Sequence, residues 1–197
     1  MKYLLSIIFL VTITLLSACS TRSPTPNFYL LENELNPKQY SGELRIGLGP
    51  VEVADYLQKP QIALRTNSSQ IKFAEFDRWA SSLRGLIINA LQHDLAKQLN
   101  TNNIYEYPWR QSDQVDYSVA IDIKRLDASF KSGEAYLEAK AIIKDSNDNS
   151  FVETISLSQD LDRNSFDALV KAERQLLLYL SEQLSLAIQR LEDDQRP

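Results

Sequence analysis

The sequence predicts an α+β fold of two layers, in which a mainly antiparallel β-sheet is covered by two long α-helices. Several segments alternate apolar and polar residues, as strands with one buried face do. Two longer segments, residues 79–99 and 165–191, repeat apolar residues every three or four positions, which is the spacing of one helix face. Groups of Asn, Asp, Ser and Gly separate the strand segments and predict turns.

The first part of the chain predicts four short strands, at residues 28–31, 44–53, 62–66 and 70–76. Gly49-Pro50 interrupts the second strand and indicates a bulge or an edge position, because proline cannot donate to a β-ladder. Asn67-Ser68-Ser69 separates the third strand from the fourth, so this pair reads as a hairpin. Helix 79–99 comes next.

The second part predicts strands at residues 104–107, 115–130, 135–143 and 151–161, and then helix 165–191. In residues 115–123 the odd positions are apolar, whereas beyond Arg125 the even positions are apolar. Because side chains alternate between the two faces of a strand, this change of phase predicts a bulge or a bend near Arg125. The last three strands are expected to form an antiparallel meander.

Residues 1–18 are predicted to be a lipoprotein signal peptide that is removed. Lys2 precedes an apolar stretch that is shorter than the roughly 20 residues needed to cross a bilayer. The stretch ends in Leu-Ser-Ala before Cys19, the only cysteine, which resembles the lipidated cysteine of the bacterial lipobox. The alternative is a plain signal peptide with an incidental thiol.

Lipidation at Cys19, with acyl groups such as palmitate, divides the chain into three parts. The signal peptide is followed by a lipidated tether at residues 19–27, which is polar and contains two prolines. Residues 28–197 are expected to form a single α+β domain in the periplasm. Ser20 rather than aspartate follows the cysteine, and this favours the outer membrane by resemblance to other bacterial lipoproteins.

Composition and motifs argue against nucleic acid binding and against catalysis. The chain has 21 basic and 26 acidic residues, for a net charge of −5, and lacks the clustered basic face that phosphate backbones require. His93 is the only histidine, so neither a histidine-based metal site nor a nucleophile-base pair is expected. Residues 145–148 are rich in aspartate, but a hairpin turn is favoured over calcium. We expect no enzyme activity, catalytic residue, metal or cofactor.

Three motifs in order resemble a known family: IGLGPV at residues 46–51, YLQKPQI at 56–62 followed by Arg65, and EFDRWA at 75–80. The chain is similar to PqiC-type (YmbA-like) ABC-type transport auxiliary lipoproteins of MCE lipid-transport systems. The resemblance extends from Phe28 to the final helix. The chain departs from the family pattern at Ala54, at Gln58-Lys59 and at Ser81-Ser82.

The resemblance implies an accessory lipoprotein that is anchored in the outer membrane, faces the periplasm and docks onto an MCE-domain protein. It would support lipid transport between membranes and membrane integrity. A partner or subunit surface is expected at Tyr56, Pro60, Arg78 and Trp79, although Trp79 could instead fill the core. The resemblance also implies that the protein can form a homo-oligomer, and no other feature of the sequence points to one. The alternative function is that of an envelope-biogenesis lipoprotein for lipopolysaccharide or outer-membrane-protein assembly.

Overall fold

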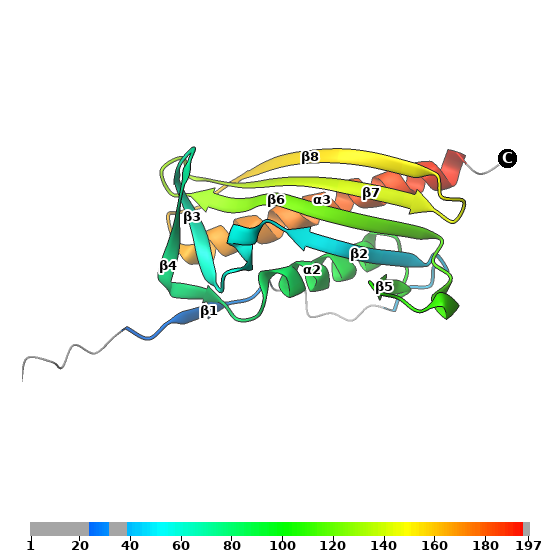
Figure 1. Cartoon of the computed structure of the whole chain (residues 1–197), viewed down its shortest axis with the longest axis horizontal. Coiled ribbons are helices and arrows are strands. Elements are labelled where there is room, and N and C mark those ends of the chain that lie inside the picture. The colour runs from blue at the N-terminus through cyan, green and yellow to red at the C-terminus, as the bar shows by residue number, and fades with distance from the viewer. Residues whose placement is uncertain (1–23, 32–38, 195–197) are drawn as a thin grey trace, which may run out of the picture.

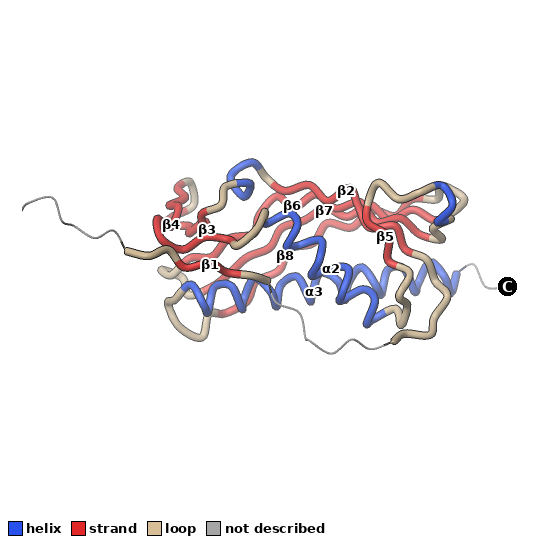
Figure 2. The backbone as a smooth tube through the Cα atoms, turned by 90° about the horizontal axis from the view of Figure 1, so that it is seen from below, coloured by secondary structure: helices blue, strands red, loops and turns tan. Residues whose placement is uncertain are grey.

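In residues 24–31 and 39–194, which the computed structural model describes, eight strands form one curled sheet with two long helices on one side (Figures 1 and 2). The strands are β1 (Asn27–Tyr29), β2 (Ile46–Val53), β3 (Gln61–Asn67), β4 (Gln70–Trp79), β5 (Ile104–Glu106), β6 (Tyr117–Ser129), β7 (Glu134–Asp145) and β8 (Ser150–Asp160). The helices are α2 (Leu83–Gln98) and α3 (Phe166–Asp194), and the short 3-10 turns are η2 (Asp55–Gln58) and η3 (Gln111–Asp113).

The long strand β6 is the centre of the sheet. On one side it pairs with β7, which in turn pairs with β8, and both pairings are antiparallel. On its other side β2 runs parallel to the first half of β6, and β3 meets β6 further along, where Leu64 is opposite Ala128. The β3–β4 hairpin therefore lies at one end of the molecule, with β1 parallel to β4 beyond it (Figure 1).

The fold class is confirmed as α+β, but the description of the sheet as mainly antiparallel is not confirmed. The sheet is mixed: β1–β4, β2–β5, β2–β6 and β3–β6 are parallel pairs, whereas β3–β4, β6–β7 and β7–β8 are antiparallel. The sheet also curls, so the simple two-layer description is not confirmed. Alternation along a strand shows which residues are buried but not the direction of its neighbour, which depends on long crossover connections such as α2.

Both predicted bulges are present. The β2–β6 register shifts between Leu48 and Val51, where Gly49 has φ of +118°, a conformation that residues with a Cβ rarely adopt. The β6–β7 register shifts between Ile123 and Arg125. This second shift keeps Leu126 and Ala128 in the core and turns Arg125 and Asp127 to the opposite face.

The core lies between the sheet and the two helices. Leu169, Leu177, Leu180 and Ile188 of α3 have no exposed surface, as the apolar stripe predicts. A buried ion pair also joins the helices: Arg174 of α3 donates from Nη1 and Nη2 to the two carboxylate oxygens of Asp94 on α2, at 2.7 and 2.6 Å.

Helix α2 begins at Leu83, four residues later than the sequence predicts. The Trp79 amide donates to the Pro60 carbonyl at 2.8 Å, and Trp79 is opposite Tyr29 in the β4–β1 pair, so this residue ends a strand. Ser82 then caps the helix, because its Oγ accepts the Gly85 amide at 3.2 Å. Tertiary pairing thus overrides the helical spacing at the start of this segment.

Candidate functional site

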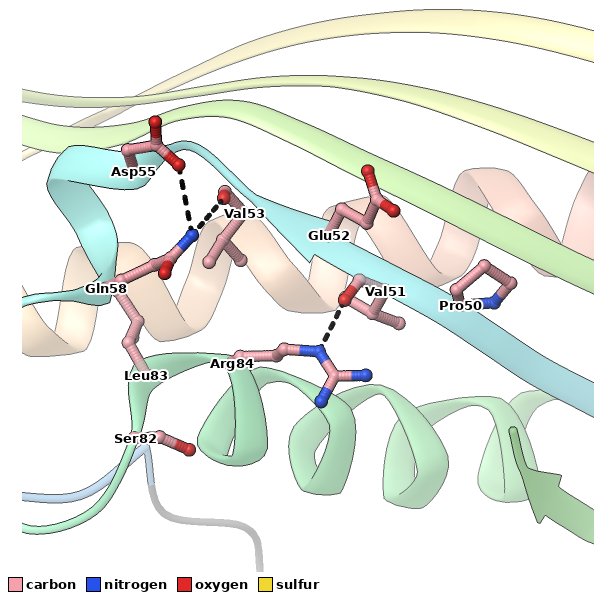
Figure 3. Close-up of a pocket in the computed structure, with 9 residues that line it drawn as sticks. All are labelled: Pro50, Val51, Glu52, Val53, Asp55, Gln58, Ser82, Leu83 and Arg84. Atoms are coloured by element: carbon pink, nitrogen blue, oxygen red, sulfur yellow. Dashed lines mark hydrogen bonds between the residues drawn. The ribbon is translucent and has the colours of Figure 1, made fainter. Parts of the chain in front are cut away.

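A groove of about 670 Å³ lies where the end of β2, the η2 turn and the first turn of α2 meet (Figure 3). Its walls carry Glu52, Asp55 and Arg84. Arg84 donates from Nε to the Val51 carbonyl at 2.7 Å, and Gln58 donates from Nε2 to Asp55 Oδ1 at 3.2 Å. Because both carboxylates and a guanidinium line it, the groove can bind polar groups of either sign.

A second group of polar residues, which we name the Asp127 cluster, surrounds a carboxylate with no exposed surface. Arg65 donates to Asp127 from Nε at 2.9 Å and from Nη2 at 2.6 Å. Arg125 adds a bond from Nε at 3.1 Å, and the Tyr56 hydroxyl adds one at 2.9 Å. The four bonds saturate the carboxylate, which is the condition for tolerating a buried charge.

The cluster is assembled by the curl of the sheet. In the β6–β7 ladder Asp127 is opposite Tyr136, so both side chains point to the face away from the helices. Arg65 reaches this face from β3, and Tyr56 reaches it from η2. Residues that lie about 60 to 70 positions apart in the sequence thereby share one carboxylate, and η2 and β3 are fastened to β6.

The pKa shifts within the cluster follow from these contacts. Burial opposes ionisation of Asp127, but hydrogen bonds from Arg65 and Tyr56 and the charge of Arg125 outweigh it, so the pKa of Asp127 is lowered. The pKa of Tyr56 is raised, first because burial disfavours the phenolate and next because Asp127 is negative. At neutral pH the cluster therefore holds an ionised carboxylate and a neutral phenol.

The four residues of the predicted partner surface differ in how far they are exposed. Pro60 is exposed, and Arg78 is partly exposed and donates from Nε to the Glu75 carbonyl at 3.3 Å. Tyr56 is partly buried and belongs to the Asp127 cluster. Trp79 is 5% exposed and packs in the core, so it contributes almost no surface to this chain. Pro60 and Arg78 remain as predicted contact residues.

Cys19, the predicted lipidation site, lies outside the described residues, as do the signal segment and part of the tether. Among the helices of the described part, none is both long and apolar enough to cross a membrane.

No group of three or more His, Cys, Asp or Glu side chains that could hold a metal ion occurs within residues 24–31 and 39–194. His93 lies with Nδ1 3.4 Å from Asp94 Oδ1. In the aspartate-rich segment, Asp145 accepts the amides of Asn147 and Asn149 at 2.8 and 2.9 Å, which is a turn built on a side chain.

Comparison with known protein families identifies the family of this chain, and comparison with solved structures gives the same fold. The family model described as ABC-type transport auxiliary lipoprotein component matches residues 29–185. A crystal structure of an uncharacterised protein is 18% identical with a TM-score of 0.70, and the alignment covers 84% of this chain and 99% of that one. A DUF330 protein from Xanthomonas campestris is 16% identical with a TM-score of 0.66, covering 86% and 100%. At these identities the two structures show the fold alone. A search of curated proteins found no match.

Proposed function

We propose that this chain, which belongs to the family of ABC-type transport auxiliary lipoprotein components, is an outer-membrane-anchored subunit of an MCE-type lipid transport system. It acts from the periplasmic face, contacts the MCE-domain protein and supports membrane integrity without catalysing a reaction. The match of the family over residues 29–185 carries this proposal. The family gives the role as an auxiliary component of a transport system. The location in the outer membrane and the MCE-domain partner are the parts that we propose.

The position of the predicted anchor supports this arrangement. Strand β1 begins at Asn27, eight residues after Cys19, and eight extended residues span at most about 28 Å. The first described residues leave the fold at the end of its long axis where β3 and β4 lie (Figure 1). A lipid on Cys19 would therefore hold this end near the membrane, with the exposed Pro60 close to it.

Recovery of partners from detergent-solubilised envelopes tests the proposal. We expect the lipidated protein to co-purify with an MCE-domain protein. The Cys19→Ala variant is expected to leave the membrane fraction, because no acyl chain remains to anchor it. Quantitative mass spectrometry of the bound proteins and fractionation of the two membranes are the measurements. Recovery of lipopolysaccharide or outer-membrane-protein assembly factors, without an MCE protein, would instead support the envelope-biogenesis alternative.

Substitution Arg78→Ala tests the predicted contact surface. Arg78 lies beside Pro60, because β3 pairs Gln61 with Arg78 next to it. An arginine at the centre of an interface often contributes 2 kcal/mol or more, so we expect the amount of recovered partner to fall by about tenfold or more. Arg190→Ala, on an exposed position near the C-terminal end of α3, is the matched control and should leave recovery unchanged. Equal recovery with both variants would contradict the contact.

A further inference from the structure

A hollow of about 540 Å³ opens over the Asp127 cluster, on the face of the sheet away from the helices. Three cationic side chains line it, those of Arg65, Arg125 and Lys131, and none of its lining residues is Asp or Glu. We infer that this hollow is a binding site for a phosphate group, either free or carried by a lipid head group.

The charges of the cluster do not cancel. Two guanidinium groups share the single carboxylate of Asp127, which has no surface of its own, and Lys131 adds a third positive charge at the rim. Glu138 approaches Arg125 Nη1 at 3.3 Å, but its side chain is half-exposed and does not line the hollow. Glu134 accepts the Tyr136 hydroxyl, and it too does not line the hollow. Both acids therefore lie outside the lining, and the charged side chains that face the hollow are all cationic.

The two guanidinium groups also keep unused donors in a fixed arrangement. Arg125 Nη2 has no hydrogen-bond partner among the described residues, and Arg65 Nη1 donates only to the Ser68 carbonyl, at 3.4 Å. Both guanidinium groups are fixed by their hydrogen bonds to Asp127. Arg125 Cζ also lies 4.1 Å from the centroid of the Tyr136 ring. A planar guanidinium that is already immobilised loses little entropy when it binds an oxyanion, which is why arginine is favoured at phosphate sites.

Hydroxyl groups complete the lining and help to define the ligand. Ser68, Ser129 and Ser132 border the hollow together with Thr66. The Ser132 hydroxyl already donates to the Ser129 carbonyl at 3.4 Å, and the Thr66 hydroxyl donates to Gln70 Oε1 at 3.0 Å. The Ser68 and Ser129 hydroxyls can donate to a tetrahedral oxyanion that has several acceptor oxygens. The volume exceeds that of a phosphate ion, so the hollow has room for an organic group esterified to it. The β3–β4 turn and the β6–β7 turn that form the rim lie at the end of the molecule where β1 begins (Figure 1).

Calorimetric titration of the purified lipidated protein, in a non-ionic detergent without phosphate, tests this inference. Inorganic phosphate and dihexanoyl phosphatidylglycerol are the two probes. We expect saturable binding with one site per chain. Lys131→Gln should weaken it by about tenfold or more, because one charge-assisted hydrogen bond is lost. Lys140→Gln, an exposed lysine on β7 that does not line this hollow, is the matched control and should bind as the wild type does.

The outcomes separate the two sources of the phosphate group. Tighter binding of the phospholipid probe than of inorganic phosphate assigns a lipid head group, and the reverse assigns free phosphate. Absence of binding by both probes, or equal binding by Lys131→Gln and Lys140→Gln, overturns the site. Lys131 is exposed, so its substitution should leave the circular dichroism spectrum unchanged. The inference does not depend on the proposed transport partner, whose recovery is measured separately.

Discussion

Replacing Asp127 by asparagine is expected to lower the free energy of unfolding by about 3 kcal/mol. The substitution keeps the shape of the side chain but removes the charge that Arg65, Arg125 and Tyr56 share. Each of the two arginine side chains is only 21% exposed, so water cannot fully replace the lost carboxylate. Urea unfolding followed by circular dichroism at pH 7 should show a lower midpoint at an unchanged slope.

The matched control for this substitution is Asp148→Asn. Asp148 also pairs with a cation, because Lys144 Nζ lies 3.3 Å from its carboxylate, but its side chain is 87% exposed. We expect a loss of at most about 0.5 kcal/mol there, since exposed i, i+4 pairs contribute little. Equal losses in the two variants would show that the Asp127 cluster contributes no more than a surface pair.

The same cluster predicts a dependence on acid pH. Because the folded pKa of Asp127 lies below the ordinary value of 3.8, the unfolded chain takes up a proton first as the pH falls. The stability that Asp127 contributes is therefore complete above the ordinary value and is lost as the pH falls through the folded pKa. Urea midpoints measured from pH 5 to pH 2.5 should fall more steeply for the wild type than for Asp127→Asn.

The positions of the strands are predictable from the sequence, whereas their directions are not. Alternation and turn residues are local signals, and they identify β6, its bulge at Arg125 and the β3–β4 hairpin. The partner of β5 is β2, more than 50 residues earlier in the chain, and the connection between these two parallel strands contains β3, β4 and α2. Strand direction is set by such connections, which leave no periodic trace in either strand.

The Asp127 cluster is hidden from sequence analysis for a related reason. Beyond the bulge, Leu126 and Ala128 face the core, so Asp127 reads as a solvent residue of an amphipathic strand. Its burial comes from Arg65 and Tyr56, which the curl of the sheet carries over this face. One signal was available: Arg65 belongs to the motifs that carry the family resemblance, although no role could be assigned to it.

A buried acid on α3 also could have been noticed from the sequence. Glu173 lies four residues from both Leu169 and Leu177, which places it in the apolar stripe of the helix. In the structure it is 1% exposed, and its Oε2 has no hydrogen-bond partner among the described residues. Burial raises the pKa of Glu173 well above its ordinary value, and the negative charge of Asp127 raises it further. The fold therefore favours the neutral, protonated form of this carboxyl.

Glu173 is expected to make the protein less stable as the pH rises above the ordinary glutamate value of 4.5. In that range the unfolded chain releases the proton while the folded chain keeps it. The free energy of unfolding then falls by up to about 1.4 kcal/mol per pH unit, until the folded pKa is reached. Glu173→Gln has no proton to release, so its stability should lack this slope and exceed that of the wild type at pH 8. Urea unfolding from pH 5 to pH 8 is the measurement.

Glu182→Gln, at an exposed position on the same helix, is the control and should follow the wild-type pH curve. If Glu173→Gln followed that curve as well, Glu173 would have an ordinary pKa and its proposed protonation would be wrong.

The pH dependence caused by Glu173 should also respond to Asp127, because this carboxylate is the second cause of the pKa shift. In Asp127→Asn that charge is absent, so the pKa of Glu173 falls and its destabilising slope ends at a lower pH. The fold therefore favours opposite protonation states at the two carboxyls: it is more stable when Asp127 is ionised and when Glu173 is protonated.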